Sequence, residues 1–173
     1  HPADTTRIAE ATERAAQYGP RVVKDSIDFS LMRARTRVLE TDSPNEAQGY
    51  FAGELAAGRD TPENRYGYAV ALANLDQNDQ ALAALQPVID QYPKQPNVAL
   101  LQAQILAQSG KSADAMAVYA RNLANFPRYA PGILKYAEAL INAGKPDDAR
   151  QLLITHDQAL GNRIDAARLL SVA

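Results

Sequence analysis

The sequence lacks cysteine and tryptophan, and aromatic residues make up 6% of its 173 residues. Without cysteine the chain can form neither a disulfide nor a thiolate metal site, which fits any cellular compartment. No apolar run approaches the roughly 18 residues that a membrane-spanning helix needs, so the sequence predicts no transmembrane segment. A formal net charge of −2 argues against nucleic-acid binding, because phosphate contacts require clustered lysine and arginine.

Apolar residues, mostly alanine and leucine, amount to 46% of the chain, which is enough for a buried core. Because aromatic rings are scarce, small side chains must provide much of the packing. Small side chains at a contact let two helices approach closely. This composition therefore suits a protein built from closely packed helices.

The organising pattern is a repeat with a period of 34 residues. One column of this repeat holds a small residue, namely Ala47, Ala81, Ala115 and Ala149. A second column, four positions later, holds a large residue: Phe51, Leu85, Tyr119 and Leu153. A third column is aliphatic, with Val38, Leu72, Leu106 and Leu140. A period of this length is typical of solenoids, in which each unit buries its apolar face against its neighbours.

The residue types in these columns fit pairs of antiparallel helices. Alanine allows the two helices of a pair to approach, and the large residue one turn later fills the space between neighbouring pairs. Gly110 and Gly144 stand at matching turns, where glycine can end a helix in the left-handed conformation. Pro93 and Pro127 each close one unit, because proline cannot continue a helix.

This pattern resembles the tetratricopeptide repeat, and the resemblance implies an all-α fold, a tetratricopeptide-repeat helical-hairpin solenoid or α-α superhelix. We expect about four repeats within residues 28–163, near 28–61, 62–95, 96–129 and 130–163. The first unit lacks the turn glycine and the closing proline. Residues 164–173 are predicted to be the first helix of a truncated further repeat. Its apolar face would be uncapped, so we expect the natural protein to continue beyond it.

In this family the first helix of each hairpin lines the concave surface. The resemblance therefore implies a partner-binding surface that is apolar and rich in amides, made of Phe29, Met32, Tyr66, Val70, Asn74, Leu100, Gln104, Gln108, Leu134, Glu138 and Asn142. Asn74, Gln108 and Asn142 recur at the repeat period. Their carboxamides could bind the backbone of an extended ligand, or they could simply be polar residues on a solvated face.

Some tetratricopeptide domains grip a C-terminal carboxylate with lysine, asparagine and arginine at set concave positions. Here these positions hold Met32, Thr36, Gly67, Asn97 and Leu101. The clamp is essentially absent, so this use of the fold is not expected.

Residues 1–27 are predicted to form a lead-in helix outside the repeats. Residues 3–18 are amphipathic, with Ile8, Ala11, Ala15 and Tyr18 on one face. The stretches "HPADTTRI" and "DFSLMRARTRVL" resemble the segment between the catalytic domain and the repeats in bacterial HExxH zinc metallopeptidases of the β-barrel assembly-enhancing protease family. The resemblance implies that residues 1–27 join the repeats to a peptidase domain that is not in this chain.

The sequence itself predicts no catalytic residue and no metal ligand. It contains no HExxH, the motif that places two histidines on zinc and a glutamate as general base. Its histidines are His1 and His156, which are far apart in sequence and too few for a tetrahedral site. Asp147 and Asp148 suit a helix start, where carboxylates interact favourably with the helix dipole. No cofactor is expected in this chain, whereas the resemblance implies zinc in the peptidase domain.

A local basic cluster, "RARTR", contains Arg33, Arg35 and Arg37. It can be interpreted as a solvated helix face or as an ion-pair contact to a peptidase domain.

The leading hypothesis is a protein-interaction module of a periplasmic zinc metalloprotease. By resemblance it would bind protein or peptide segments, its own peptidase domain and the outer-membrane β-barrel assembly machinery with its substrates. The alternative is a freestanding tetratricopeptide scaffold in cell-envelope assembly, which would lack a peptidase domain. An enzyme within this chain would need an acid–base constellation, and Glu138 alone does not make one.

Overall fold

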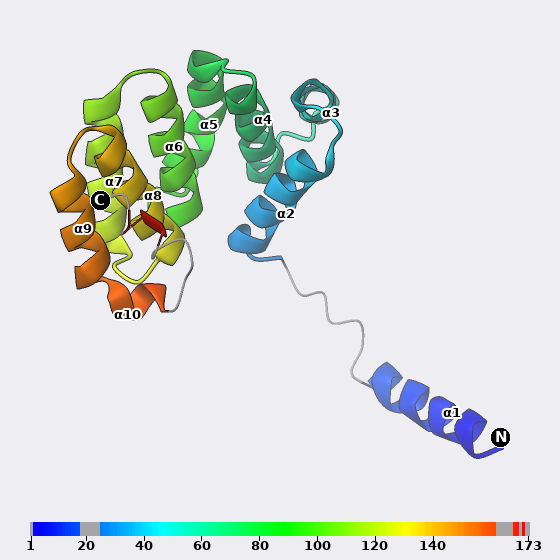
Figure 1. Ribbon diagram of the computed structural model, residues 1–173. Helices are drawn as coiled ribbons and strands as arrows, with labels where there is room; N and C mark the ends of the chain where they lie inside the picture. Colours follow the sequence, from blue (N-terminus) through cyan, green and yellow to red (C-terminus); the bar gives the residue numbers. More distant parts are fainter. Residues whose placement is uncertain (1, 18–24, 162–167, 170, 172–173) are drawn as a thin grey trace.

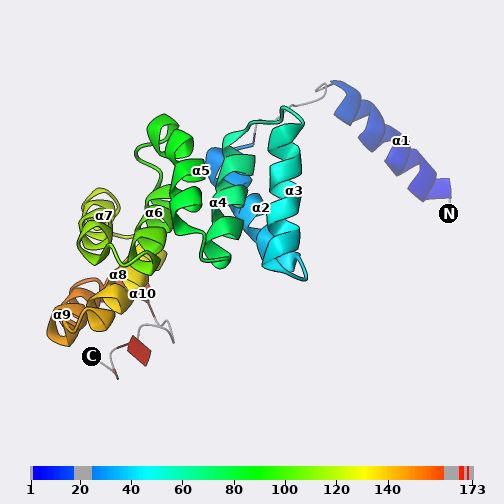
Figure 2. The same cartoon turned by 90° about the horizontal axis from the view of Figure 1, so that it is seen from above.

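The computed structural model describes residues 2–17, 25–161, 168–169 and 171. Over these residues all regular structure is helical, which confirms the predicted all-α solenoid of helical hairpins. Figure 1 shows helices α2 to α9 stacked in chain order, each beside the one that follows it. Seen from above in Figure 2, the stack curves from α3 to α9.

Four hairpins make up the stack within the described residues. The first pairs α2 (Ile27–Glu40) with α3 (Pro44–Ala56), and the second pairs α4 (Pro62–Asn74) with α5 (Asn78–Gln91). The third pairs α6 (Pro96–Gln108) with α7 (Ser112–Asn125), and the fourth pairs α8 (Ala130–Asn142) with α9 (Pro146–Thr155). A short helix, α10 (Asp157–Leu160), follows the fourth hairpin.

Helix α1 (Pro2–Gln17) precedes the hairpins and lies apart from them in both Figure 1 and Figure 2. Residues 5–14 are exposed, and the Ile8 side chain is 66% exposed. Of the predicted apolar face, Ile8 and Ala11 are therefore open to solvent, while Tyr18 lies outside the described residues. Most of residues 164–173, predicted as a further helix, also lie outside the described residues.

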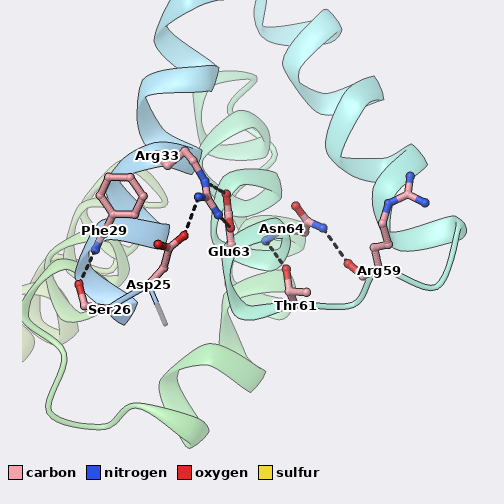
Figure 3. A network of polar contacts seen from close by, with 8 residues as sticks. All are labelled: Asp25, Ser26, Phe29, Arg33, Arg59, Thr61, Glu63 and Asn64. Carbon is pink, nitrogen blue, oxygen red and sulfur yellow. Dashed lines mark hydrogen bonds and ion pairs between the residues drawn. The ribbon is translucent and has the colours of Figure 1, made fainter. Parts of the chain in front are cut away.

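Polar side chains or prolines mark the starts of helices α2, α3, α4 and α6. Ser26, Ser43 and Thr61 are extended N-caps whose hydroxyls accept a hydrogen bond from the amide three residues later. Proline occupies the first turn of α3, α4 and α6, where its missing N–H would have no partner in any case. Figure 3 shows the caps of α2 and α4, together with Asn64, which donates to the carbonyl of Arg59 over 2.7 Å and so holds the turn before α4.

Left-handed residues end several helices. Gly110 and Gly144, as predicted, have φ of +77° and +72° in the turns of the third and fourth hairpins. In the second hairpin the same column holds Asp76, which adopts φ of +57°. Aspartate tolerates this conformation better than most side chains, so the turn keeps its shape without glycine.

The repeat columns form the core. The alanine column is at most 1% exposed, and the large-residue column is at most 4% exposed: Ala47, Ala81, Ala115, Ala149, Phe51, Leu85, Tyr119 and Leu153. The core is divided along the stack, with one cluster centred on the first two hairpins and another on the fourth hairpin. Each hairpin thus buries apolar side chains both between its own two helices and against the neighbouring hairpins, as expected of a solenoid.

Candidate peptide-binding groove

The first helices of three of the four hairpins line a groove of about 930 Å³, here called the concave groove. Helices α2, α6 and α8 supply most of its wall: Met32, Arg35, Asn97, Leu100, Gln104, Pro131, Leu134, Lys135, Glu138, Ile141 and Asn142. Tyr129, Arg168 and Leu169 complete the lining. A smaller groove of about 290 Å³ adjoins it between α6, α7 and α8 and shares Gln104, Lys135, Glu138 and Asn142 with it.

Several residues expected on the binding surface are brought together in these grooves. Six of them line the concave groove: Met32, Leu100, Gln104, Leu134, Glu138 and Asn142. Gln108 lines the smaller groove beside Asn142. Leu100 is 6% exposed and therefore forms part of the floor, whereas Glu138 and Asn142 are exposed.

Four of the expected residues lie elsewhere. Tyr66 and Val70 are 1% and 7% exposed and belong to the core, so they offer a partner no surface. The reason is that α4 packs against α2, α3 and α5, which together cover most of it. Phe29 and Asn74 are exposed but are not among the residues that line either groove.

Tyr129 and Asn97 form a polar pair on the wall of the concave groove. The Tyr129 hydroxyl donates to Oδ1 of Asn97 over 2.5 Å, and Nδ2 of Asn97 lies 3.4 Å from a carboxylate oxygen of Asp28. This chain of contacts joins the start of α8 to α6 and to the start of α2. Burial raises the pKa of Tyr129 to about 12, with a smaller opposing effect from Arg35. The hydroxyl therefore keeps its proton and remains a donor at neutral pH.

Arg35 faces the same region. It is half-buried and interacts with the hydroxyl of Tyr66. Burial raises the pKa of Tyr66, and the positive charge of Arg35 opposes that rise. Tyr66 thus takes no direct part in the groove but supports a residue that does.

The basic cluster in α2 is not one charged patch, because its three arginines point to different neighbours. Arg33 donates to both carboxylate oxygens of Glu63 at 2.8 and 2.6 Å and to Asp25 at 2.8 Å, as Figure 3 shows. The guanidinium of Arg37 lies 4.4 Å from the centre of the Tyr50 ring. Residues two apart on a helix do not share a face, which separates these side chains.

Lys135 and Glu138 form an ion pair across one helical turn of α8, with Nζ 2.6 Å from a carboxylate oxygen. Both residues line the concave groove, and the pair largely cancels their charges. Glu138 is therefore an ion-pair partner, and an acid–base role for it gains no support from this geometry.

The described part of the chain contains no group of three or more histidine, cysteine, aspartate or glutamate side chains arranged to hold a metal ion. His156 caps the end of α9, and its Nδ1 lies 3.0 Å from the carbonyl oxygen of Pro127. This contact joins the fourth hairpin to the third and accounts for His156 structurally. Among the described helices, none combines the length and apolar character needed to cross a bilayer.

Comparison with known proteins agrees with the repeat architecture. The tetratricopeptide repeat family model matches residues 38–105 and 106–172. The chain belongs to the tetratricopeptide repeat family. A structure of a thermophilic tetratricopeptide-repeat protein from Thermus thermophilus superposes with a TM-score of 0.67 at 18% identity, covering 82% of this chain and 78% of that one. Repeats of this family stack into concave surfaces that bind proteins, so this chain is a protein-interaction module.

Curated relatives include the β-barrel assembly-enhancing proteases of Escherichia coli K12 and Shigella flexneri. Each is 30% identical over 157 residues, which cover 88% of this chain and 32% of the relative. The chain therefore spans about a third of the length of these relatives.

The repeat pattern does not predict several of the groove residues, among them Arg35, Tyr129 and Lys135. They do not recur at the repeat period; the residue 34 positions after Arg35, for example, is Ala69. Asn97 was considered only as a position of the carboxylate clamp. Asn97 and Tyr129 stand at the starts of α6 and α8, which the sequence does show. Nothing in the sequence indicates that these two helix starts lie beside α2.

Proposed function

We propose that the concave groove captures an extended protein segment and holds it in a fixed position. The groove that α2, α6 and α8 form is the observation that carries this proposal. Its aliphatic side chains suit apolar residues of a ligand, while Gln104 and Asn142 offer amides that can bind a peptide backbone. A preformed groove on rigid helices limits the ordering cost of binding to the ligand itself.

We also propose that these repeats serve a periplasmic zinc metallopeptidase, as the similarity to the β-barrel assembly-enhancing proteases suggests. The zinc and its HExxH motif would belong to a peptidase domain outside this chain. The repeats would bind substrates or the outer-membrane β-barrel assembly machinery and position them for cleavage. Holding a segment beside an active site raises its effective concentration there.

The test is zinc content and proteolysis of the full-length gene product that carries these repeats. We expect about one zinc per chain, as in HExxH enzymes, and cleavage of unfolded outer-membrane protein that EDTA abolishes. This chain alone should show neither property. A full-length product without zinc and without proteolysis would overturn the peptidase assignment and favour a scaffold in cell-envelope assembly.

A further inference from the structure

Arg35 is a half-buried cation that no carboxylate of the described residues neutralises. None of the ion pairs in the described part of the chain includes it. Arg65 is also half-buried, but unlike Arg35 it forms an ion pair, with Asp60. Arg35 contacts the hydroxyl of Tyr66 instead, and it lines the concave groove.

The charged groups around Arg35 leave the groove cationic. Its lining carries Arg35, Lys135 and Arg168 against one carboxylate, Glu138, in a chain whose formal net charge is −2. Glu138 is already paired with Lys135. Asp28, at the start of α2, lies within hydrogen-bond distance of Asn97. Among the described residues no ion pair neutralises Arg35 or Arg168, so both can meet an anionic partner.

Apolar and amide groups lie in the same groove as this charge. Met32, Leu100 and Leu134 supply aliphatic surface on α2, α6 and α8. The side chains of Gln104 and Asn142 make no hydrogen bond within the described residues. These two amides continue from the concave groove into the smaller groove, so a ligand chain can extend past Arg35 instead of ending there.

We propose that the concave groove selects extended segments in which an aspartate or glutamate side chain pairs with Arg35 and a neighbouring aliphatic residue packs near Met32 and Leu134. This proposal rests on the proposed function of the groove. A guanidinium can bind a carboxylate through two parallel hydrogen bonds, which gives geometric specificity. Half-burial of Arg35 reduces solvent screening of the pair.

A positional-scanning library of acetylated and amidated peptides tests this selectivity. Fluorescence anisotropy with this chain should rank peptides with one acidic residue beside leucine or isoleucine highest. Changing that acid to its amide should weaken binding about tenfold, as expected for a charge-assisted pair. Arg35→Gln should produce the same loss, whereas Arg35→Glu should shift the preference to lysine and arginine.

Arg150→Gln on the exposed face of α9 is the matched control and should bind as the wild type does. Arg35→Lys provides a milder variant, which should retain the acid preference with reduced affinity; circular dichroism checks that each variant is folded. Equal binding of acid and amide peptides, or unchanged binding by Arg35→Gln, would overturn the acidic subsite but leave the groove function standing. A requirement for a free C-terminal carboxylate would also overturn it. Binding of no peptide would remove both proposals.

Discussion

Gly67 determines how closely α4 can pack against α3. A β-carbon at this position would come within 2.2 to 2.7 Å of atoms of the Phe51 ring. Real β-carbons do not approach other atoms so closely, and the ring is itself fully buried in the core. The aromatic member of the large-residue column is therefore accommodated by a glycine on the neighbouring hairpin.

We expect Gly67→Ala to lower the free energy of unfolding by about 1–3 kcal/mol because it overpacks this contact. Gly53→Ala is the control, because a β-carbon at this position would meet no atom within 4 Å. This substitution should stabilise α3 by about 0.5–1 kcal/mol. Urea denaturation of both variants measures the difference. Equal effects at the two sites would contradict the packing described here.

Asp76 and Gly110 occupy the same repeat column and the same left-handed conformation. Asp76→Gly should therefore raise the free energy of unfolding by about 0.5–1 kcal/mol, because a left-handed side chain is strained. Gly110→Asp should lower it by a similar amount. The pair is measured by thermal and urea unfolding, and a loss of stability in Asp76→Gly would show that the aspartate side chain contributes more than its strain costs.

Two tyrosines, one buried and one half-buried, make stability depend on alkaline pH. Burial raises the pKa of Tyr119 and of Tyr129 to about 12, against a value of 10.0 for free tyrosine. The unfolded chain then loses these protons at lower pH than the folded chain. We expect stability to fall between about pH 10 and pH 12, as linkage requires. Tyr119→Phe should reduce this loss of stability with rising pH, measured by urea denaturation at a series of pH values. An unchanged pH dependence would contradict the assignment to Tyr119.

At the scale of single helices, proline has opposite consequences at different positions. Pro96 stands in the first turn of α6, where no hydrogen bond is lost. Pro87 lies inside α5 and cannot donate to the turn before it. The local sequence rules thus explain where α6 begins, whereas packing of Leu85 and Val88 in the core holds α5 helical across Pro87.

Pro87→Ala should restore the missing backbone hydrogen bond of α5 and raise the free energy of unfolding by about 1–2 kcal/mol. Pro96→Ala should change it by less than about 0.5 kcal/mol. Helicity by circular dichroism and urea midpoints compare the two. A destabilised Pro87→Ala would mean that the core requires the shape that proline imposes on α5.

Helices and their core columns could be predicted from the sequence because the same small and large residues recur at a fixed period. The alanine column and Phe51 illustrate this, as each was identified by type and position alone. Tyr66 and Val70 were expected on the binding surface because the first helix of a hairpin faces the concave side in this family. They are buried here because α2, α3 and α5 cover α4. Arg35 and Tyr129 could not be found by periodicity, since their proximity depends on how non-adjacent hairpins curve toward each other.

At the scale of the whole molecule, the divided core predicts that the hairpins differ in how they unfold. Leu85 belongs to the large cluster of the first hairpins, and Leu153 belongs to the cluster of the fourth. Both occupy one repeat column and are at most 1% exposed. Stability in a solenoid is a sum over units and their interfaces, so position along the stack matters.

We expect Leu153→Ala and Leu85→Ala each to lower the free energy of unfolding of the surrounding hairpins by about 2–5 kcal/mol. We expect Leu153→Ala to increase hydrogen exchange in α8 and α9 while α4 and α5 stay protected, because the end hairpin can open alone. Leu85→Ala should reduce protection across the first three hairpins together. Identical exchange patterns in the two variants would show that the stack unfolds as one unit.

The most direct test of the central claim, that partners bind in the concave groove, is site-specific photo-crosslinking of the full-length protein in cells. The photoreactive residue replaces Met32, Gln104 or Asn142 in the grooves, and Gln86 or Ala117 on exposed faces of α5 and α7 as controls. We expect protein adducts at the groove positions and not at the control positions. When the crosslinking is repeated in a cell extract, an added acidic peptide should compete and remove these adducts. Adducts confined to the control positions, or spread equally over both sets, would contradict it.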